Sequence, residues 1–337
     1  MTLLALDIGG ANLKVADGLG YARSQFFSLW KYPDRLVDNL RRLVSTSPAC
    51  DHLAITMTGE LADCFSTKNE GVEFILEAVV QASEGRHMHV YFANGTLVTP
   101  QVALASPQEA AAANWHALAM FSGRYIQDQS ALLIDLGSTT CDIIPLEEGK
   151  PIGEGGNDTQ RMIHGELVYS GIARTPICGL VRQVDFRGKA CPVAREVFGT
   201  SLDVYLTLDD LPEDPQNLET ADGRPATKAA ARDRLARTIC TDRTMFSTGE
   251  ARVMALAVAR VQTEEIHEMA NRVARRLSTG CAAIVISGQG EFLARRVAAR
   301  MGLENNIISL AEQLGDRVSS CAAAHAVAVL AREAVGL

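Results

Sequence analysis

The sequence has no block of basic residues, no long apolar run and no basic leader. Its 337 residues carry a formal net charge of -8, with a pI near 5.5, which argues against nucleic acid as a partner. No apolar run approaches the roughly 20 residues that a membrane-spanning helix needs, and the N-terminus lacks the basic head of a signal peptide. These absences predict a soluble cytoplasmic protein with neither a nucleic-acid nor a membrane partner.

The sequence also lacks closely spaced cysteines and low-complexity linkers. Its eight cysteines are scattered with no Cys-x-x-Cys pair, whereas zinc or an iron–sulfur cluster needs closer ligands. Several, such as Cys281 and Cys321, lie in apolar or helical contexts, so we expect reduced and mostly buried thiols. The length and the 47% hydrophobic content suffice for two packed domains of roughly 100–200 residues each.

Two acidic-glycine segments, residues 3–14 and 131–144, stand out. Each consists of an apolar run, an aspartate, a glycine turn with small polar residues, and a second apolar run. The pattern predicts two β-hairpins whose turns face a phosphate, because glycine lets backbone amides approach an anion and aspartate can hold hydrated Mg²⁺. For either segment alone, the alternative is an ordinary structural hairpin. The predicted binding residues are Asp7, Gly9, Gly10, Asn12 and Lys14 in the first turn, and Asp135, Gly137, Ser138, Thr139, Thr140 and Asp142 in the second.

Hydrophobic periodicity predicts strands and helices over most of the chain. The expected strands span 3–16, 22–30, 52–58, 89–93, 131–135, 141–146 and 282–287. The expected helices span 34–45, 71–83, 110–121, 249–277, 291–301 and 319–334. Between 153 and 247 the pattern fails, and so long an irregular stretch is either functional or disordered. Its mixture of Tyr, Leu, Val and Arg with paired acids favours a function.

A third element, residues 284–294, runs from a strand through Gly288-Gln-Gly290 into a helix. Such a junction suits the ribose or α-phosphate of a nucleotide near a helix N-terminus. Strand–glycine–helix junctions are also common in structural settings. This element follows the two acidic-glycine segments in the sequence and lies near the C-terminus. It is informative because of this order, since the junction alone is a weak signal.

The order of these three elements resembles the superfamily of acetate kinase, sugar kinases, heat-shock ATPases and actin. The resemblance implies an α/β fold with two ribonuclease-H-like domains flanking a central cleft, at residues 1–120 and 121–318. A C-terminal helix at about 319–337 would return to the first domain, and the second domain would carry the insertion at about 153–247. By the same resemblance Asp7 and Asp135, with Asp142, would organise a metal, and residues 138–140 would hold phosphate.

A narrower resemblance rests on residues 56–63, 135–145, 165–176, 220–224 and 234–242. Together these segments are similar to the hydantoinase/oxoprolinase-related group linked to tetrahydromethanopterin-dependent one-carbon transfer. Its archaeal members are methanofuran-pathway synthases, which join an aminomethyl-furanmethyl diphosphate to the phenol of γ-glutamyl-tyramine and release diphosphate. The resemblance implies a transferase that uses Mg²⁺ and acts on small molecules, with ATP or the substrate's own diphosphate at the turns.

Glutamates and arginines in these segments are the candidates for the remaining chemistry. A base near the phenol would assist its attack, and Glu60, Glu109 and Glu166 each stand beside a glycine or a helix start. A solvated or capping role is their alternative. Arg174 and Arg224 fit a clamp for diphosphate or carboxylate, with a structural salt bridge as the alternative.

Two other functions stay open at this point. An ATP-dependent kinase or amidohydrolase of the same fold is favoured by Gly288 and Gly290, because a diphosphate substrate needs no adenosine pocket. A non-catalytic nucleotide sensor or assembly factor would bind ATP and change domain closure without turnover. A homodimer is compatible with each of these functions.

Overall fold

The first predicted hairpin begins a six-stranded sheet in the computed structural model, which describes residues 2–337. In spatial order its strands are β3 (Ala22–Phe26), β2 (Asn12–Ala16), β1 (Leu3–Ile8), β4 (His52–Met57), β5 (His87–Tyr91) and β6 (Leu97–Val98). β1 pairs antiparallel with β2 and parallel with β4. β1 and β4 are almost entirely buried because helices cover both faces of the sheet.

The second hairpin repeats this plan in a second sheet. In spatial order its strands are β10 (Leu167–Val168), β8 (Cys141–Glu147), β7 (Ala131–Leu136), β13 (Ala283–Ser287) and β14 (Ile307–Ser309), with β9 (Lys150–Pro151) beside β8. β7 pairs antiparallel with β8 and parallel with β13, just as β1 pairs with β2 and β4. This repeated order of five strands confirms the expected pair of ribonuclease-H-like domains.

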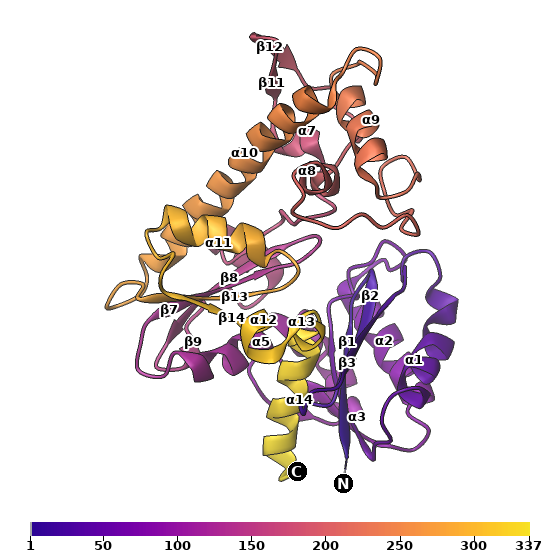
Figure 1. The fold of residues 1–337 in the computed structure, drawn as a ribbon. Helices are drawn as coiled ribbons and strands as arrows, with labels where there is room; N and C mark the ends of the chain where they lie inside the picture. Colours follow the sequence, from indigo (N-terminus) through magenta and orange to yellow (C-terminus); the bar gives the residue numbers. More distant parts are fainter. Residues whose placement is uncertain (1) are drawn as a thin grey trace.

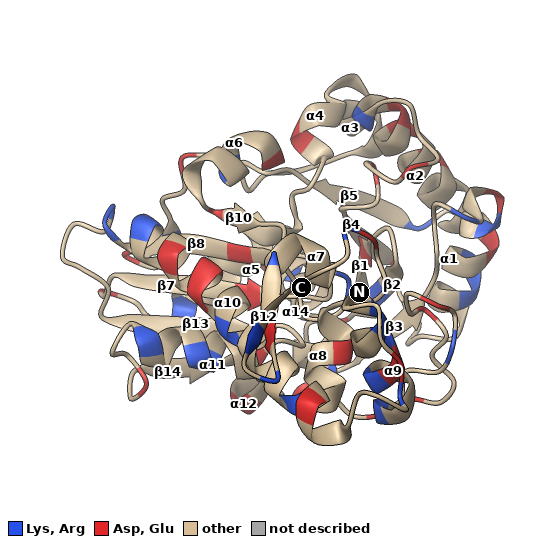
Figure 2. Ribbon diagram, turned by 90° about the horizontal axis from the view of Figure 1, so that it is seen from above, with Lys and Arg blue, Asp and Glu red and all other residues tan. Residues whose placement is uncertain are grey.

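Helices cover the outer and inner faces of both sheets. The outer faces carry α1 (Leu36–Ser45) and α2 (Lys68–Ala82) on the first sheet, and α10 (Thr248–Ala274) and α11 (Glu291–Arg300) on the second. Between the sheets lie α5 (Asn114–Ser122) and the alanine-rich α14 (Ala322–Val335), as Figures 1 and 2 show. α14 contacts β1, β2, β4 and α5, and one apolar cluster contains residues of α5, α14 and both sheets.

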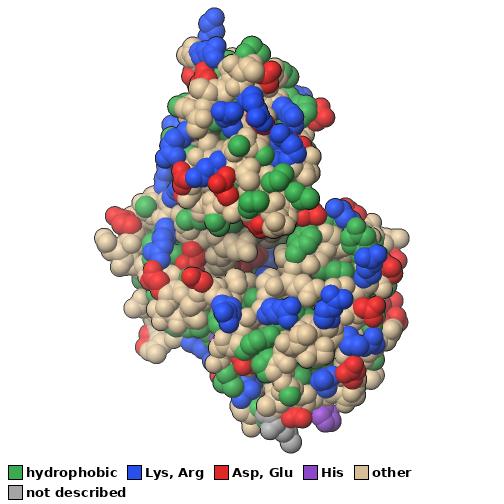
Figure 3. All heavy atoms as spheres, turned by 45° about the vertical axis from the view of Figure 1, so that its right-hand side comes forward, with side chains coloured by type: hydrophobic (Ala, Val, Ile, Leu, Met, Phe, Trp, Pro, Cys, Tyr) green, Lys and Arg blue, Asp and Glu red, His purple; other side chains and the backbone are tan. Residues whose placement is uncertain are grey.

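Most of the stretch that looked irregular in the sequence, from α7 onward, forms an ordered lobe above the two domains (Figure 1). The lobe contains α7 (Ile177–Leu180), β11 (Gln183–Phe186), β12 (Lys189–Pro192), α8 (Ser201–Thr207) and α9 (Lys228–Thr238). α10 starts in the lobe and runs down to the second sheet, and their apolar cores are continuous. The surface is hollowed between the lobe and the domains below it (Figure 3).

The predicted strands and long helices are present, with one exception. The expected helix over 110–121 is interrupted at Ala112, whose φ of 48° lies in the left-handed region that an α-helix cannot include. α4 (Pro107–Ala110) therefore ends before α5 begins. The remaining short helices are the 3-10 turns Pro33–Arg35 and Gly123–Tyr125, α3 (Pro100–Ala105), α6 (Asp158–His164), α12 (Leu310–Leu314) and α13 (Asp316–Ser319).

The cysteines are less buried than expected. All eight are free thiols, but only Cys141 and Cys321 are buried, five are partly buried and Cys240 is exposed. Within residues 2–337, no helix combines the length and the apolar character that crossing a bilayer requires.

Candidate active site

The turns that follow β1 and β7 have the same backbone hydrogen bond. Gly9 N–H donates to the carbonyl of Asn12, and Gly137 N–H donates to the carbonyl of Thr140, both at 2.9 Å. The glycine opens the turn in each case, and the polar residue closes it. The predicted pair of hairpin turns is therefore present with matching geometry.

Each turn is held from outside by the segment that follows the strand beside its hairpin, β3 in the first sheet and β10 in the second. Leu29 N–H donates to the carbonyl of Gly10 at 2.9 Å, and Arg174 N–H donates to the carbonyl of Ser138 at 3.0 Å. The amides at the tips, in contrast, donate to no acceptor in the described chain, which leaves them available to an anion. These free amides belong to Gly10, Ala11, Ser138 and Thr139.

Lys14 lies between the aspartates of the two turns. Its Nζ is 3.6 Å from Asp7 Oδ2. Burial lowers the pKa of Lys14, but the negative charges of Asp7 and Asp135 raise it by more, so the net shift of this pKa is upward. Burial raises the pKa of Asp7, with partial compensation by Lys14. Burial and the nearby Asp142 raise the pKa of Asp135 to about 6. The strand ends of the two domains are thus electrostatically coupled at this point.

Mg²⁺ at this position would depend on few protein ligands. Across residues 2–337, no three His, Cys, Asp or Glu side chains are grouped so that they could hold a metal ion. Mg²⁺ commonly keeps several waters and uses one or two carboxylates with substrate phosphates. Asp7 and Asp135 fit that pattern, and Asp7 Oδ1 is a buried acceptor with no partner in the described chain, which a hydrated cation would satisfy.

Asp142, also predicted as a metal ligand, forms an ion pair with the buried Arg161. Its Oδ1 is 2.5 Å from Arg161 Nη2, and the guanidinium lies 4.2 Å from the ring centroid of Trp115. Asp142 faces Asp135 across β7–β8 just as Lys14 faces Asp7 across β1–β2. In the second repeat a carboxylate thus stands where the first has Lys14, and Arg161 serves as the counter-ion of this carboxylate.

Glu60 lies buried in the loop after β4, next to the first turn. The two residues before it donate their amides to the carbonyl of Ile8, each at 3.0 Å, which ties the loop to the end of β1. The Glu60 side chain is about 1% exposed, and Oε2 has no hydrogen-bond partner in the described chain. Burial raises the pKa of Glu60 to about 7, while nearby Lys68 lowers it. A carboxylate that titrates near neutral pH is suited to general base catalysis.

An ion pair between the domains lies beside Glu60. Lys68 Nζ, at the start of α2, is 3.0 Å from Asp158 Oδ2, at the start of α6. A small pocket adjoins this pair between the same two helix starts and Trp115. Sequence reasoning missed Lys68, Asp158 and Arg161, because no local motif marks residues that become neighbours only when the domains pack together.

The other two predicted glutamates lie in different environments. Glu109 is on α4 and is exposed. Glu166 is buried, and both of its oxygens are engaged: Oε1 accepts from Glu154 N–H at 2.7 Å, and Oε2 accepts from Gly155 N–H at 3.1 Å. Arg276 also pairs with Oε1. This arrangement supports a structural role for Glu166, closing the loop at 153–156, and its catalytic role stays a prediction.

We expect Glu166→Ala to destabilise the protein by about 3 kcal/mol, because it leaves Arg276 without its buried partner and two amides without an acceptor. Urea unfolding measures the loss, and the rate per folded molecule should stay near that of the wild type. Glu109→Ala is the matched control, and its effect should stay within about 0.5 kcal/mol. Lost turnover at unchanged stability would return Glu166 to the candidate bases.

The glycines of the third element pack closely against the end of β7. A Cβ on Gly288 would lie 2.5 Å from the carbonyl oxygen of Leu136, and Gly288 has a φ of +87°. Gly290 N–H donates to the same carbonyl at 2.8 Å, and a Cβ there would lie 2.8 Å from Ile172. Close packing therefore requires both glycines, and their role in nucleotide binding stays a prediction.

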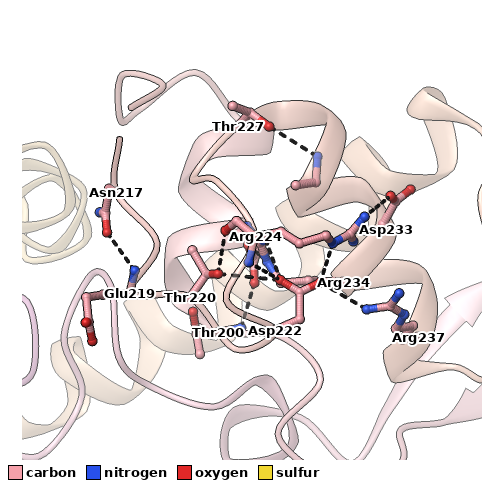
Figure 4. Close-up of polar contacts among 12 residues, drawn as sticks. Thr200, Asn217, Glu219, Thr220, Asp222, Arg224, Thr227, Asp233, Arg234 and Arg237 are labelled. Atoms are coloured by element: carbon pink, nitrogen blue, oxygen red, sulfur yellow. Dashed lines mark hydrogen bonds and ion pairs between the residues drawn. The ribbon is translucent and has the colours of Figure 1, made fainter. Parts of the chain in front are cut away.

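Arg224 belongs to a network of arginines and aspartates in the upper lobe (Figure 4). Its Nε donates to Asp222 Oδ2 at 2.7 Å, and its Nη1 donates to Asp233 Oδ2 at 3.0 Å. Asp222 also accepts from Arg234 and Arg237, each at 3.0 Å. Although partial burial opposes it, this pairing lowers the pKa of Asp222. Arg224 thus has the structural salt bridge that was the alternative to an anion clamp.

Arg174 differs from Arg224 because its guanidinium has no carboxylate partner within the described residues. It is exposed, and its guanidinium carbon lies 5.0 Å from the ring centroid of Trp30, a residue of the first domain. Of the two predicted clamp arginines, Arg174 is therefore the one whose donors remain available to an anion.

Known proteins are similar to this chain over nearly its whole length. Residues 51–333 match the hydantoinase/oxoprolinase family. The chain is 35% identical to (4-{4-[2-(gamma-L-glutamylamino)ethyl]phenoxymethyl}furan-2-yl)methanamine synthase of Methanocaldococcus jannaschii, over 331 residues and 97% of each protein. A synthase of the same name from Methanococcus vannielii is 32% identical over 205 residues, which are 60% of this chain and 91% of that protein.

Among solved structures, a nucleotide-free acetone carboxylase superposes with a TM-score of 0.51 at 10% identity. The superposition covers 97% of this chain and 70% of that one. At this level of identity the likeness concerns the fold alone, and it agrees with the two repeated sheets.

Proposed function

The chain belongs to the hydantoinase/oxoprolinase family, and from that premise we propose that it is a transferase of methanofuran biosynthesis, which joins a furan to a phenol through an ether. Support comes from the Methanocaldococcus jannaschii relative, which aligns over 97% of both proteins. The name of that relative describes a furan methanamine linked by a phenoxymethyl ether to a γ-glutamylaminoethyl chain. The alignment is long enough to include the upper lobe as well as both domains.

The proposed donor is an aminomethyl-furanmethyl diphosphate, and the proposed acceptor is the phenol of a tyramine or tyrosine derivative such as γ-glutamyl-tyramine. The phenolic oxygen forms a bond to the furan-linked methylene carbon as the bond from that carbon to diphosphate breaks. The electron pair of the broken bond leaves with diphosphate, and the phenolic proton passes to a base. Negative charge therefore grows on the departing diphosphate, which is where stabilisation has its largest effect.

The pair of matched turns is the observation that carries the proposal. Their free amides, on Gly10 and Ala11 in one domain and on Ser138 and Thr139 in the other, would donate to oxygens of the diphosphate from both sides. Lys14 adds a fixed positive charge between the turns. Asp7 and Asp135 would hold Mg²⁺ through water or directly, and a bound Mg²⁺ would neutralise charge on the leaving group.

Glu60 is the proposed base. Its free oxygen and its pKa near 7 make it a proton acceptor at neutral pH, whereas Glu109 is exposed and the oxygens of Glu166 are already engaged. Arg174 is the proposed clamp, because its guanidinium is free and its own amide is bonded to the second turn.

An ATP-dependent kinase or amidohydrolase is the second candidate. The observation that favours it is the position of the Gly288 loop, whose backbone packs against the end of β7 beside Asp135. A nucleotide at this loop would place its phosphates toward the same two turns, so both functions would use the same anion site.

The test is a coupling assay with purified protein, Mg²⁺, the furan diphosphate and a panel of phenolic acceptors, without ATP. We expect one diphosphate released for each ether formed, with the ether identified by mass spectrometry. Omission of the acceptor controls for simple hydrolysis of the donor. Formation of ADP in a parallel reaction with ATP, and of no ether with any acceptor, would instead assign the kinase or amidohydrolase function.

A further inference from the structure

Arg174 and Trp30 lie in corresponding segments of the two halves of the molecule, where Arg174 is the counterpart of Leu29. Trp30 directly follows Leu29, whose amide holds the first turn, and the amide of Arg174 itself holds the second turn. Their side chains nevertheless meet, with the guanidinium carbon 5.0 Å from the indole ring centroid. The pair therefore connects the segments that support the two turns, one from each domain.

The contacts around this pair are weak and partly exposed. An exposed cation–π contact is worth about 0.5–1 kcal/mol. Beside it, Lys31 forms an ion pair with Glu219 of the upper lobe at 3.6 Å, and both of these side chains are nearly half exposed, so their pairing is worth at most about 1 kcal/mol. Contacts that contribute so little free energy break and form readily. Little free energy is lost when a stronger contact replaces them.

An anion between the turns would offer Arg174 a stronger partner than the indole. Hydrogen bonds to charged groups are worth about 1.5–3 kcal/mol, and arginine binds phosphate oxygens in a bidentate manner. The backbone of Arg174 is bonded to Ser138, so the arginine starts beside the amides of Ser138 and Thr139. Rotation of its side chain alone would exchange the Trp30 ring for the anion.

We propose that Arg174 and Trp30 form an anion-responsive gate: a diphosphate group bound at the two turns draws Arg174 from the Trp30 ring, and the exposed ring face then stacks on the furan of the donor. The furan is assigned to Trp30 because a single methylene joins it to the diphosphate, so it must lie close to the turns. The flat indole offers this ring a stacking partner. The identity of the donor rests on the proposed function, whereas the response of the gate to diphosphate does not.

Intrinsic fluorescence tests the gate without turnover, because the chain has only two tryptophans, Trp30 and Trp115. Inorganic diphosphate with Mg²⁺ should produce a saturable change in emission of the wild-type protein. In Trp30→Phe the change should disappear while calorimetry still detects diphosphate binding within about threefold of the wild type, or about 0.65 kcal/mol.

Variants at Arg174 supply the second readout. Arg174→Gln should abolish the change in emission and weaken diphosphate binding about tenfold, and Arg174→Lys should give an intermediate affinity because lysine lacks the bidentate fork. Arg195→Gln, at an exposed arginine of the same lobe with no ion pair in the described structure, is the matched control for charge and should behave as the wild type.

Two results would overturn the gate. One is diphosphate binding to the wild-type protein without any change in emission, and the other is wild-type affinity in Arg174→Gln. A tighter response to ADP than to diphosphate would assign the anion to a nucleotide and overturn the furan assignment. Failure of the coupling assay leaves these measurements unaffected, so the gate and the proposed reaction fail separately.

Discussion

Glu60→Gln should lower kcat by about 10²–10⁴-fold, the usual contribution of a general base, while the protein remains folded. The substitution keeps the size of the side chain and replaces a buried carboxyl, whose Oε2 has no partner in the described chain, with a neutral amide that cannot accept the phenolic proton. Steady-state kinetics with the furan diphosphate and a phenolic acceptor measures the effect.

The pH profile gives this prediction a second readout. The base must be deprotonated to act, and burial raises the pKa of Glu60 to about 7, so the wild-type rate should rise as the pH increases through about 7. In Glu60→Gln that rise should vanish. Glu109→Gln, at an exposed glutamate, should retain wild-type turnover and profile. Wild-type turnover in Glu60→Gln would remove Glu60 from the mechanism.

Lys14→Met should destabilise the folded protein by about 3 kcal/mol at pH 8, because it leaves the buried Asp7 without its counter-charge. The loss should depend on pH. Burial raises the pKa of Asp135 from 3.8 to about 6, so the folded protein binds more protons than the unfolded chain between these values, and this group makes stability fall as the pH rises from about 4 to about 6.

Lys14 limits that fall, because its charge lowers the pKa of both Asp7 and Asp135. In Lys14→Met both pKa values should rise further, which extends the fall to higher pH. The variant should therefore be nearest to wild-type stability at about pH 4 and furthest from it at pH 8, as measured by urea unfolding across this range.

Lys31→Met is the matched control for Lys14→Met. Lys31 pairs with Glu219 in an exposed contact, so its removal should cost less than about 1 kcal/mol at every pH. An equal loss at all pH values in Lys14→Met would contradict the coupling between Lys14 and the two aspartates.

The sequence alone was enough to identify the two turns and the repeated architecture around them. The signals are local: an aspartate two residues before a glycine, apolar runs on both sides, and polar residues that close the turn. The matching bonds of Gly9 and Gly137 follow from these neighbours, so no distant contact was needed to predict them. The interrupted helix at Ala112 was missed because a run of alanines carries no local signal for a left-handed residue.

Tertiary structure sets the different environments of the three glutamates. Each stands beside a glycine or a helix start in the sequence, and nothing local separates them. Glu60 is buried with a free oxygen, Glu109 is exposed, and Glu166 is engaged by Arg276, which is 110 residues away. Burial and the supply of partners determine whether a carboxylate can act as a base, and both arise only when distant segments pack together.

The packing of distant segments also distinguishes Arg174 from Arg224. Because such packing leaves no local signal in the sequence, the contacts between domains were not foreseen. The sequence determined that two matched glycine turns exist and which residues form them. Only the tertiary structure decided that Lys14 couples their aspartates, that Lys68 pairs with Asp158 across 90 residues, and that Arg174 meets Trp30. Turn geometry depends on neighbouring residues in the chain, whereas electrostatic coupling depends on distance in space, which the packing of the two domains sets.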